Sequence, residues 1–417
     1  MATAFMFNVP YVGHINPCIP LVRELVSRGE RVVFYSTERF RAIAEAAGAT
    51  FRLFPYEETE PGRALTLMVR WQLRVTEASL PQLQADVLQY QPTYVICDYA
   101  CVWGQDFARY MKLPLVCVFT TFPGAFDHRP GLRAMLGEVW RSPRLLGAAL
   151  SFVMLDRRIA RRLCVPRLKT PMAIVKRCRG DLNIVMTSAN IHTSPARPAS
   201  DYHYVGPCVR SAGMSDGSPL PARDSRPLVY ISLGTCFYRR PEFYRACVEA
   251  FSDGAYQVVL AAGVGFADCC FERLPTHIHV RDRVDQIAAL EQAAVFVTHG
   301  GMNSVSESLF AGVPMVVFPQ ALDQFAIARY VAASGSGMIL QPEDVTATRI
   351  RQIIDSVAHS RRMRARAREL GDEWRSLGGP QRAADIILAP RAETALPGCE
   401  PGASRLRLHP ARIGESA

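Results

Sequence analysis

Residues 295–324, V-F-V-T-H-G-G-M-N-S-V-S-E-S-L-F-A-G-V-P-M-V-V-F-P-Q-A-L-D-Q, decide the fold of this chain. The apolar and largely β-branched run Val295–Thr298 predicts a short buried strand. Gly300 and Gly301 follow it at once, which predicts a tight turn with close backbone approach.

A helix is expected after this turn. Ser304 followed by Glu307 has the spacing of a capping box, so we expect the helix to begin at Ser304. Gly312 and Pro314 should end it, and Val316–Phe318 is expected to be the next buried strand. A strand, a turn, a helix and a strand in this order are typical of a parallel α/β sheet.

The glycine turn is also a candidate binding site. A helix N-terminus behind a glycine turn, at the carboxyl end of a parallel strand, favours an anionic phosphate group. His299, Asn303 and Ser304 add side-chain donors at the same point. The stretch therefore predicts a cradle for a diphosphate.

The composition limits the class of protein. The chain has 417 residues, enough for two domains, and 49% of them are hydrophobic, enough for a core in each. The formal net charge of +10 is compatible with nucleic acid or an anionic membrane as a partner. Because the arginines are spread over helix faces, without a dense run interleaved with aromatic residues, we expect no nucleic-acid partner.

Targeting signals and cysteine spacing favour a cytoplasmic protein. The N-terminus lacks a basic segment followed by a long apolar one, so no signal peptide is expected. No apolar run approaches the roughly 18 residues of a membrane span. None of the 12 cysteines has CxxC spacing, and most lie in apolar strands or helices, as expected for reduced, packed thiols.

Strand and helix patterns alternate along the chain twice. The first series predicts an acceptor-side domain over residues 1–206, and the second predicts a domain over residues 228–380. Residues 207–227 carry Pro, Gly, Ser and Asp without periodicity, so they are the expected linker. A short helix is expected at 381–389, and a disordered tail at 390–417.

Two segments of the first half are less regular. Residues 10–17, P-Y-V-G-H-I-N-P, are expected to form a loop after the first strand. Residues 123–180 are expected to mix short amphipathic helices with clustered arginines, at positions 157, 158, 161 and 162. Two parallel α/β halves should place the loops that follow their strands in a shared cleft.

His14 and Asp98 are a candidate base and its partner. His14 follows the first strand and Asp98 ends the fourth, and these strand ends can be neighbours in a doubly wound sheet. Asp98 would then orient His14 through one ring nitrogen and stabilise the imidazolium. A histidine bonded to loop backbone and an aspartate at a helix N-cap are the structural alternatives.

Further candidates follow strands of the second half. Gly234 and Thr235 can point N–H groups and a hydroxyl at a phosphate, and Asp323 and Gln324 offer a carboxylate and an amide to sugar hydroxyls. A simple turn and a solvated loop are the alternatives. Glu307 has two interpretations, because a capping carboxylate would bond back to the helix start, while its position one turn into the helix suits a ribose diol.

Several cofactor motifs are missing. No G-x-G-x-x-G follows the first strand, which disfavours a dinucleotide oxidoreductase, and no Walker A motif is present. No D-x-D motif or His/Cys cluster indicates a metal on the diphosphate. The charge of a leaving diphosphate would then be met by the helix dipole, backbone N–H groups and the donors of residues 299–304.

The stretch H-G-G-M-N-S-x-x-E at 299–307, with G-V-P-M-x-x-x-P and D-Q downstream, resembles the donor-binding signature of family 1 nucleotide-sugar-dependent glycosyltransferases. G-H-I-N-P at 13–17 and S-L-G-T at 232–235 resemble the bacterial macrolide glycosyltransferase branch. The resemblance covers roughly residues 4–388. It implies the α/β GT-B fold, in which two Rossmann-like, doubly wound parallel-sheet domains face each other across a cleft.

The resemblance also implies roles for residues of both halves. His14 would deprotonate the acceptor hydroxyl with Asp98 as its partner, and Glu307 would hold the ribose. The residues implied to bind phosphate and sugar are His299, Gly234, Thr235, Gly301, Asn303 and Ser304, followed by Asp323 and Gln324. The final helix would cross back towards the first domain.

The chain departs from the family at one loop. The family often has an aromatic residue and then V-P-Q or A-P-Q where this chain has Arg283, Val284, Asp285 and Gln286. Arg283, Val284 and Gln286 are assigned to donor binding, with the Arg283 guanidinium stacked on the base. Asp285 in place of proline is expected to make this loop less rigid.

Together these features predict a metal-independent, inverting enzyme without a resident cofactor. It would transfer a hexose, glucose from UDP-glucose, to a hydroxyl of a small hydrophobic aglycone, as a monomer or weak homodimer. The acceptor pocket walls are expected in residues 61–92 and 121–170, with the aromatic residues Trp71, Trp103, Phe122, Phe126, Trp140 and Phe152. For any one of these side chains, a place in the hydrophobic core is the favoured alternative. A nucleotide-sugar epimerase on the same fold and a non-catalytic auxiliary protein are the alternatives.

Overall fold

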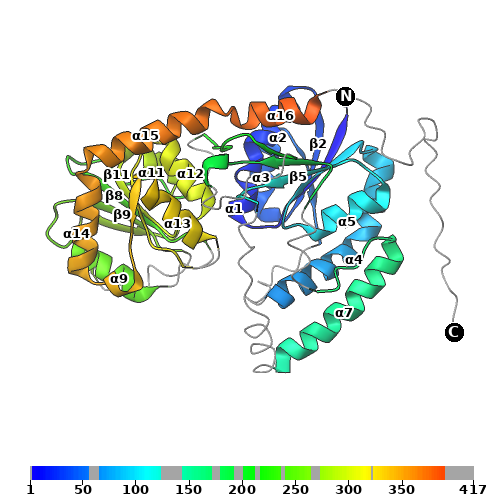
Figure 1. The fold of residues 1–417 in the computed structure, drawn as a ribbon, viewed down its shortest axis with the longest axis horizontal. Helices are drawn as coiled ribbons and strands as arrows, with labels where there is room; N and C mark the ends of the chain where they lie inside the picture. Colours follow the sequence, from blue (N-terminus) through cyan, green and yellow to red (C-terminus); the bar gives the residue numbers. More distant parts are fainter. Residues whose placement is uncertain are drawn as a thin grey trace. The chain divides into compact units, whose positions relative to one another are not determined.

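A computed structural model describes residues 2–55, 65–123, 143–170, 179–191, 201–211, 217–235, 240–263, 273–320 and 323–389. Within these ranges the chain forms two sheets in which every strand pairing is parallel (Figure 1). The first has seven strands in the order β3-β2-β1-β4-β5-β6-β7, and the second has six in the order β10-β9-β8-β11-β12-β13. The expected pair of doubly wound α/β sheets is confirmed.

The first sheet is built from short apolar strands. Its strands are β1 (Thr3–Phe7), β2 (Arg31–Ser36), β3 (Thr50–Leu53), β4 (Tyr94–Asp98), β5 (Leu115–Phe119), β6 (Leu182–Val185) and β7 (Tyr202–Tyr204). The central strands β1, β4 and β5 are buried along their whole length, as parallel strands covered on both faces must be. Phe7 of β1 is paired with Cys97 of β4, so the carboxyl ends of these strands are neighbours.

The helices of the first half differ from expectation in two places. They are α1 (Val12–Ile15), α2 (Cys18–Ser27), η1 (Glu38–Phe40), α3 (Arg41–Ala46), α4 (Leu65–Tyr90), α5 (Val102–Met111), α7 (Pro143–Leu163) and η2 (Ala189–Ile191). The segment 10–17 is not only a loop, because α1 forms one helical turn inside it. The arginine-rich part of 123–180 lies in one 21-residue helix, α7, rather than in several short ones.

The second half repeats the alternation closely. Its strands are β8 (Leu228–Ser232), β9 (Gln257–Ala261), β10 (Ile278–Arg281), β11 (Ala293–Thr298), β12 (Met315–Val317) and β13 (Gly337–Ile339). Its helices are α9 (Pro241–Ala250), α11 (Gln286–Gln292), α12 (Met302–Phe310), α13 (Gln324–Ala333), η3 (Pro342–Asp344), α14 (Ala347–Ala358), α15 (Arg361–Ser376) and α16 (Gly379–Leu388). The edge strand β13 has three residues and begins with glycine, and the sequence pattern did not predict it.

The core of the second half lies on both faces of its sheet. Leu228 and Tyr230 of β8 pack with α12 and α15 on one face, while Val229 and Ile231 pack with α9 and α14 on the other. Alternating side chains of one strand therefore enter two hydrophobic clusters, as the period of a strand dictates.

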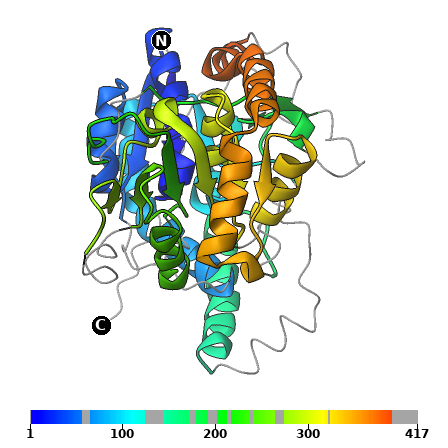
Figure 2. The same ribbon diagram turned by 90° about the vertical axis from the view of Figure 1, so that its left-hand side faces the viewer.

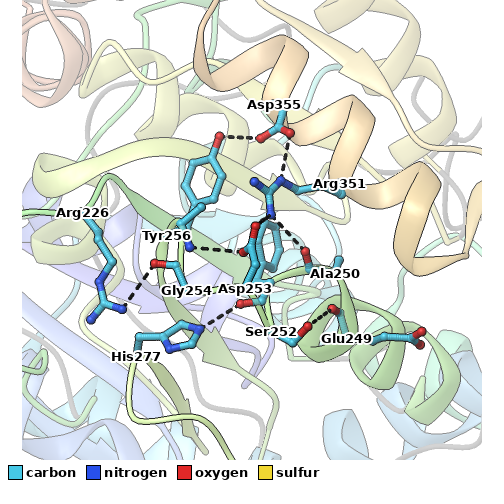
Figure 3. Close-up of polar contacts among 12 residues, drawn as sticks. Arg226, Glu249, Ala250, Ser252, Asp253, Gly254, Tyr256, His277, Arg351 and Asp355 are labelled. Atoms are coloured by element: carbon cyan, nitrogen blue, oxygen red, sulfur yellow. Dashed lines mark hydrogen bonds and ion pairs between the residues drawn. The ribbon is translucent and has the colours of Figure 1, made fainter.

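A set of polar side chains lies at the amino edge of this sheet, before the strands begin (Figure 3). Arg351 on α14 donates to Asp253 and to Asp355, each at 2.8 Å, and the Tyr256 hydroxyl donates to Asp355 at 2.6 Å. The His277 Nε2–H donates to the Phe251 carbonyl at 2.8 Å. These groups satisfy one another and tie α14 to the loop before β9.

The last described helix contacts the first half of the chain. The Arg28 guanidinium at the end of α2 donates to the Asp385 carboxylate at 2.6 Å and to the Gln381 carbonyl at 3.3 Å. Figure 1 shows α16 beside α2. No helix within the described ranges combines the length and the apolar character that a bilayer crossing needs. The tail expected at 390–417 lies outside the described residues.

Candidate active site

His14 and Asp98 form a hydrogen-bonded pair at the carboxyl edge of the first sheet. His14 lies in α1, directly after β1, and its Nδ1 is 2.9 Å from the Oδ2 of Asp98, the last residue of β4. The Asp98 side chain is fully buried, whereas the His14 side chain is 22% exposed. The other Asp98 oxygen accepts the Ala100 N–H at 2.8 Å, which fixes the carboxylate in the turn.

The structure decides between the two interpretations of Asp98. The residue before α5 is Cys101, so Asp98 does not occupy the N-cap position. A carboxylate only accepts, so the His14 Nδ1 carries the proton of this bond and Nε2 is the basic nitrogen of the neutral ring. The pair thus has the arrangement of a general base and a positioning carboxylate.

The surroundings of His14 favour its charged form. Burial alone would lower the pKa of His14, but the charge and hydrogen bond of Asp98, with a smaller contribution from Asp323, raise it above its ordinary value. The Tyr99 ring is stacked on the imidazole, with 5.6 Å between ring centroids and 27° between planes. Tyr99 is in turn stacked on Phe119 of β5 at 5.3 Å, so the His14 ring is held from the side.

His299 has a different environment at the carboxyl edge of the second sheet. It follows β11, and two glycines border its ring: a Cβ added at Gly234 would lie 2.5 Å from Cε1, and one at Gly301 would lie 2.5 Å from Nε2. Burial lowers the pKa of His299 to about 4, although the nearby Ser232 carbonyl opposes this. The ring is therefore neutral at pH 7, and its buried Nδ1 makes no hydrogen bond within the described part of the chain.

The capping box predicted at Ser304 and Glu307 is wrong. The helix α12 begins at Met302, and Gly301 is the N-cap with an extended backbone and no side-chain cap. The turn through Gly300, which has a φ of 83°, brings the chain into the helix two residues earlier than expected. Glu307 therefore lies inside the helix and cannot reach its first N–H groups.

The Glu307 carboxylate faces another loop instead. The Gln286 amide donates to it, and the same amide lies 3.5 Å from the Ser304 hydroxyl. Burial raises the pKa of Glu307, and the Gln286 bond and the charge of Arg210 only partly oppose this. Of the two interpretations of Glu307, the structure excludes the capping role and places the carboxylate beside Gln286.

The loop after β10 leads directly into α11. Asp285, at the position of the family's proline, is the N-cap of α11 and accepts the Ile287 N–H at 3.2 Å. The Arg283 carbonyl accepts the Ser218 N–H at 3.1 Å, and Val284 is buried. Gln286 begins α11 beside Glu307, which brings this loop and α12 together.

Asp323 and Gln324 start α13, and both side chains are engaged. The Thr121 hydroxyl, after β5 of the first sheet, donates to the Asp323 carboxylate at 3.0 Å. Burial raises the pKa of Asp323, while the Thr121 bond and the charge of His14 act against it. The Gln324 side-chain oxygen accepts the Gln320 N–H at 2.8 Å. Sequence reasoning missed Thr121, although its position after a central strand was a signal.

Asn303 makes a second contact between the two halves. Its side-chain amide, on the second residue of α12, donates to the Gly13 carbonyl beside His14. Thr235 is exposed in the turn after β8, next to Gly234. All the residues predicted for the donor thus lie after strands β8, β10, β11 and β12, at one edge of the second sheet, and the His14 loop contacts this edge.

The aromatic residues expected to line an acceptor pocket are mostly core residues. Trp71 and Trp103 contact each other edge to face at 5.6 Å inside the core of the first half. Phe122 and Phe152 are also buried in hydrophobic clusters. Phe126 and Trp140 lie outside the described residues. Aromatic content alone did not distinguish a pocket wall from a packed core.

Comparison with known proteins gives consistent matches. Residues 257–389 match the Erythromycin biosynthesis protein CIII-like, C-terminal domain family. The NDP-glycosyltransferase YjiC of Bacillus subtilis (strain 168) is 29% identical, with 94% of this chain and 98% of the relative covered. The oleandomycin glycosyltransferase of Streptomyces antibioticus is also 29% identical, over 92% of this chain and 90% of the relative.

Solved structures agree with the sequence relatives. The crystal structure of the glycotransferase of kitacinnamycin matches with a TM-score of 0.79 and 28% identity, over 93% of this chain and 98% of that one. CalG4, the calicheamicin glycosyltransferase, matches with a TM-score of 0.70 and 26% identity, over 93% and 97%.

The two parallel α/β sheets and the matched solved structures show the GT-B fold, and the named glycosyltransferases among the relatives support a nucleotide-sugar-dependent transferase. The matched C-terminal domain and these relatives make the chain similar to glycosyltransferases of the macrolide and natural-product type. The resemblance inferred from the H-G-G-M-N-S stretch is confirmed, and the epimerase and auxiliary alternatives are not supported.

Proposed function

We propose that the enzyme transfers glucose from UDP-glucose to a hydroxyl of a small hydrophobic aglycone, such as a macrolide, polyketide or flavonoid, with inversion at the anomeric carbon. The observation that carries this proposal is the His14–Asp98 pair, at 2.9 Å, with Asp323 close enough to influence the His14 charge. In this proposal, the base His14 of the first half and the sugar-binding carboxylate Asp323 of the second half lie at the same reacting centre. We expect the protein to act in the cytoplasm as a monomer or weak homodimer.

The proposed reaction is a single displacement. The His14 Nε2 takes the proton of the acceptor hydroxyl while that oxygen bonds to the anomeric carbon, and the bond from this carbon to the diphosphate oxygen breaks with its electron pair. UDP leaves from the face opposite the acceptor, which inverts the configuration. Asp98 stabilises the imidazolium formed, in line with the raised pKa of His14.

The departing diphosphate needs positive potential. We propose that the N-terminus of α12 supplies it, with the backbone N–H groups behind Gly301 and the hydroxyl of Thr235. His299 is neutral near pH 7 and acts as a hydrogen-bond donor rather than as a cation. In this proposal the helix dipole and neutral donors replace a metal ion.

The nucleoside and the sugar are assigned to opposite ends of this cradle. Glu307 is proposed to accept from the ribose hydroxyls, and Gln286 keeps its carboxylate in place. Arg283 and Val284 are proposed to border the base. Asp323 and Gln324 are proposed to bind the sugar, and the 3- and 4-hydroxyls of glucose would replace the Thr121 hydroxyl as donors to Asp323.

The direct test removes the base. His14→Ala should lower the rate of transfer by about 10²–10⁴-fold while leaving UDP affinity nearly unchanged. Asp98→Asn should lower the rate less and should move the ionisation seen in the pH profile of kcat/KM to lower pH, because the carboxylate that raises the His14 pKa is removed. His203→Ala, at an exposed position of β7, is the matched control.

The substrates are identified by mass spectrometry. Purified protein is incubated with UDP-glucose, dTDP-glucose and a deoxysugar donor against a panel of hydrophobic aglycones, and the glycosides are separated to read the anomeric configuration. Near-wild-type turnover of His14→Ala, or retention of configuration in the product, would contradict the mechanism.

A further inference from the structure

The helices α4 and α7 lie side by side in the first half (Figure 1 and Figure 2). Their side chains line a groove outside the donor and base sites described above. The groove has a volume of about 1050 Å³, and its lining comes from one face of α7 and two residues of α4. None of the residues assigned to donor, base or sugar contributes to it. Its chemistry therefore differs from that of the donor and base sites.

One face of α7 carries apolar side chains in contact with water. Leu150 is 63% exposed and Met154 is 72% exposed, which are large values for side chains of this size and type. They are four residues apart, so they lie next to each other on the same side of the helix. The opposite side of α7, with Phe152 and Ile159, is buried against α4 and α5.

The same exposed face continues into basic residues. Arg157 and Arg161 follow Met154 at helical spacing, and Arg158 and Arg162 flank them. With Arg74 of α4, the described lining of the groove contains five arginines and one acidic residue, Glu77. Glu77 is already paired with Arg158 at 2.6 Å, so the remaining arginines carry an excess of positive charge.

We propose that this face of α7 docks on the surface of a bilayer rich in anionic phospholipid. The guanidinium groups of Arg157, Arg161 and Arg162 would bind lipid phosphates, and Leu150 and Met154 would enter the boundary between headgroups and acyl chains. A helix with apolar residues at one end of its exposed face and arginines at the other fits such an interface.

The two kinds of side chain distinguish a bilayer from a soluble acidic partner. Arginines alone would suit an acidic peptide or a nucleic acid, but exposed Leu150 and Met154 in line with them add apolar area that lipid can cover. The proposal does not depend on which sugar or acceptor the enzyme uses. It would bring the enzyme to the phase in which hydrophobic molecules accumulate.

The experiment is vesicle cosedimentation with the full-length protein. Vesicles of phosphatidylcholine alone are compared with vesicles that contain phosphatidylglycerol, at low and at high NaCl. The wild-type protein should sediment with the anionic vesicles at low salt and not with the neutral ones, and high salt should release it because it screens the charges. Equal binding to both vesicles, or to neither, would overturn the proposal.

Two sets of substitutions test the surface itself. Arg157→Gln/Arg161→Gln/Arg162→Gln should weaken partitioning by about 100-fold, since each basic residue near an anionic surface contributes about fivefold. Leu150→Ser/Met154→Ser should weaken it by roughly tenfold through the loss of apolar contact. The matched control, Arg361→Gln/Arg362→Gln/Arg382→Gln, removes the same charge from exposed positions of α15 and α16 and should bind like the wild type.

The variants also separate the alternatives. Melting temperature and transfer to a water-soluble acceptor should be unchanged in all three variants, which shows that they fold. If the control set loses binding as much as the α7 set, the attraction is only net charge. If the Leu150/Met154 variant binds anionic vesicles as well as the wild type does, or if poly-glutamate releases the wild-type protein from these vesicles, the surface serves a soluble acidic partner. Each of these results, and a loss of binding by the control set, would refute the bilayer proposal.

Discussion

The two edges of the second sheet treat their polar groups in opposite ways. At the amino edge, His277, Arg351 and Asp253 are all bonded to protein groups nearby (Figure 3). At the carboxyl edge, the His299 Nδ1 is buried without a hydrogen-bond partner among the described residues, and the pKa of this histidine falls to about 4. The polar groups of the amino edge therefore stabilise the fold, whereas the unpaired His299 nitrogen makes the carboxyl edge the candidate binding edge.

The same contrast appears among the carboxylates. At the amino edge, the Ala255 N–H and Arg351 lower the pKa of Asp253 below its ordinary value. At the carboxyl edge, burial raises the pKa of Glu307 and of Asp323. A carboxylate with a raised pKa is destabilised in its charged form until a donor arrives. Perturbed groups at the carboxyl ends of parallel strands are the expected mark of a binding site.

The largest effect on this contrast is expected from a single methyl group. Gly301→Ala would place a Cβ 2.5 Å from the His299 Nε2, at a backbone φ of −62° that alanine accepts, so the ring itself must move. We expect UDP affinity to fall by roughly 10- to 100-fold, as overpacking of this kind costs about 1–3 kcal/mol. Isothermal titration with UDP measures it.

The control lies at the other edge. A Cβ at Gly254 would be 3.7 Å from the His277 Cε1, so there is room, but the φ of 77° is strained for alanine. Gly254→Ala should lower the melting temperature and leave UDP affinity unchanged. Equal UDP affinities for the Gly301→Ala and Gly254→Ala variants would contradict the assignment of UDP binding to the carboxyl edge.

A smaller effect is expected at Glu307. Glu307→Gln should weaken UDP binding by about tenfold, because a charge-assisted hydrogen bond to the ribose is replaced by a neutral one. A carboxyl group with a raised folded pKa stabilises the fold below its unfolded pKa and loses this contribution as pH rises through the folded pKa. The glutamine variant should therefore be at least as stable as the wild type at pH 7.

The matched control for Glu307→Gln is Glu249→Gln, at an exposed position at the end of α9. It should change neither UDP affinity nor thermal stability. Thermal unfolding at pH 5 and pH 7, together with UDP titration, gives the comparison. A Glu307→Gln variant that melts earlier but binds UDP normally would assign this carboxylate to structure.

The amino edge should respond in the reverse sense. Arg351→Ala removes bonds to Asp253, Asp355 and the Ala250 carbonyl, and the packing of the guanidinium over the Tyr256 ring. We expect the free energy of unfolding to fall by about 1–3 kcal/mol, without a change in UDP affinity. Denaturant titration measures the first quantity, and a parallel loss of affinity in the folded variant would show that the two edges are coupled.

No effect is expected from chelation. Since the proposed cradle meets the diphosphate charge with the α12 N-terminus and neutral donors, transfer should survive EDTA with less than a roughly twofold change. Rates before and after dialysis against EDTA, with Mg²⁺ or Mn²⁺ added back, test this. A strict requirement for an added divalent ion would contradict the proposed cradle.

The order of strands was predictable because each is a short apolar run at a regular distance from a helix. That order also suggested the His14–Asp98 contact, since the ends of β1 and β4 can be neighbours in a doubly wound sheet, and the structure confirms the contact. The start of α12 was not predictable in the same way. Ser304 and Glu307 match a capping box, whereas the N-cap in the structure is Gly301, which has no side chain that could give a capping signal in the sequence.

Contacts between the two halves could not be predicted from the sequence. Thr121 and Asp323 are separated by 202 positions, and no local pattern joins them. The prediction that Trp71 and Trp103 line an acceptor pocket failed for another reason. These side chains pack in the core, and their apolar surface would suit a pocket wall equally well. Periodicity reports which side chains are buried, but not whether a protein atom or a ligand buries them.

The contact between Arg28 and α16 bears on how this enzyme can be divided. A gene cut within residues 207–227 would give a first fragment that has Arg28 but lacks Asp385, and a second fragment that ends in a helix separated from its seat on α2. The two pieces would each carry one side of this contact. Neither fragment should be active alone, and mixing them should restore activity. We expect this complementation to depend on the docking of α16 against the end of α2.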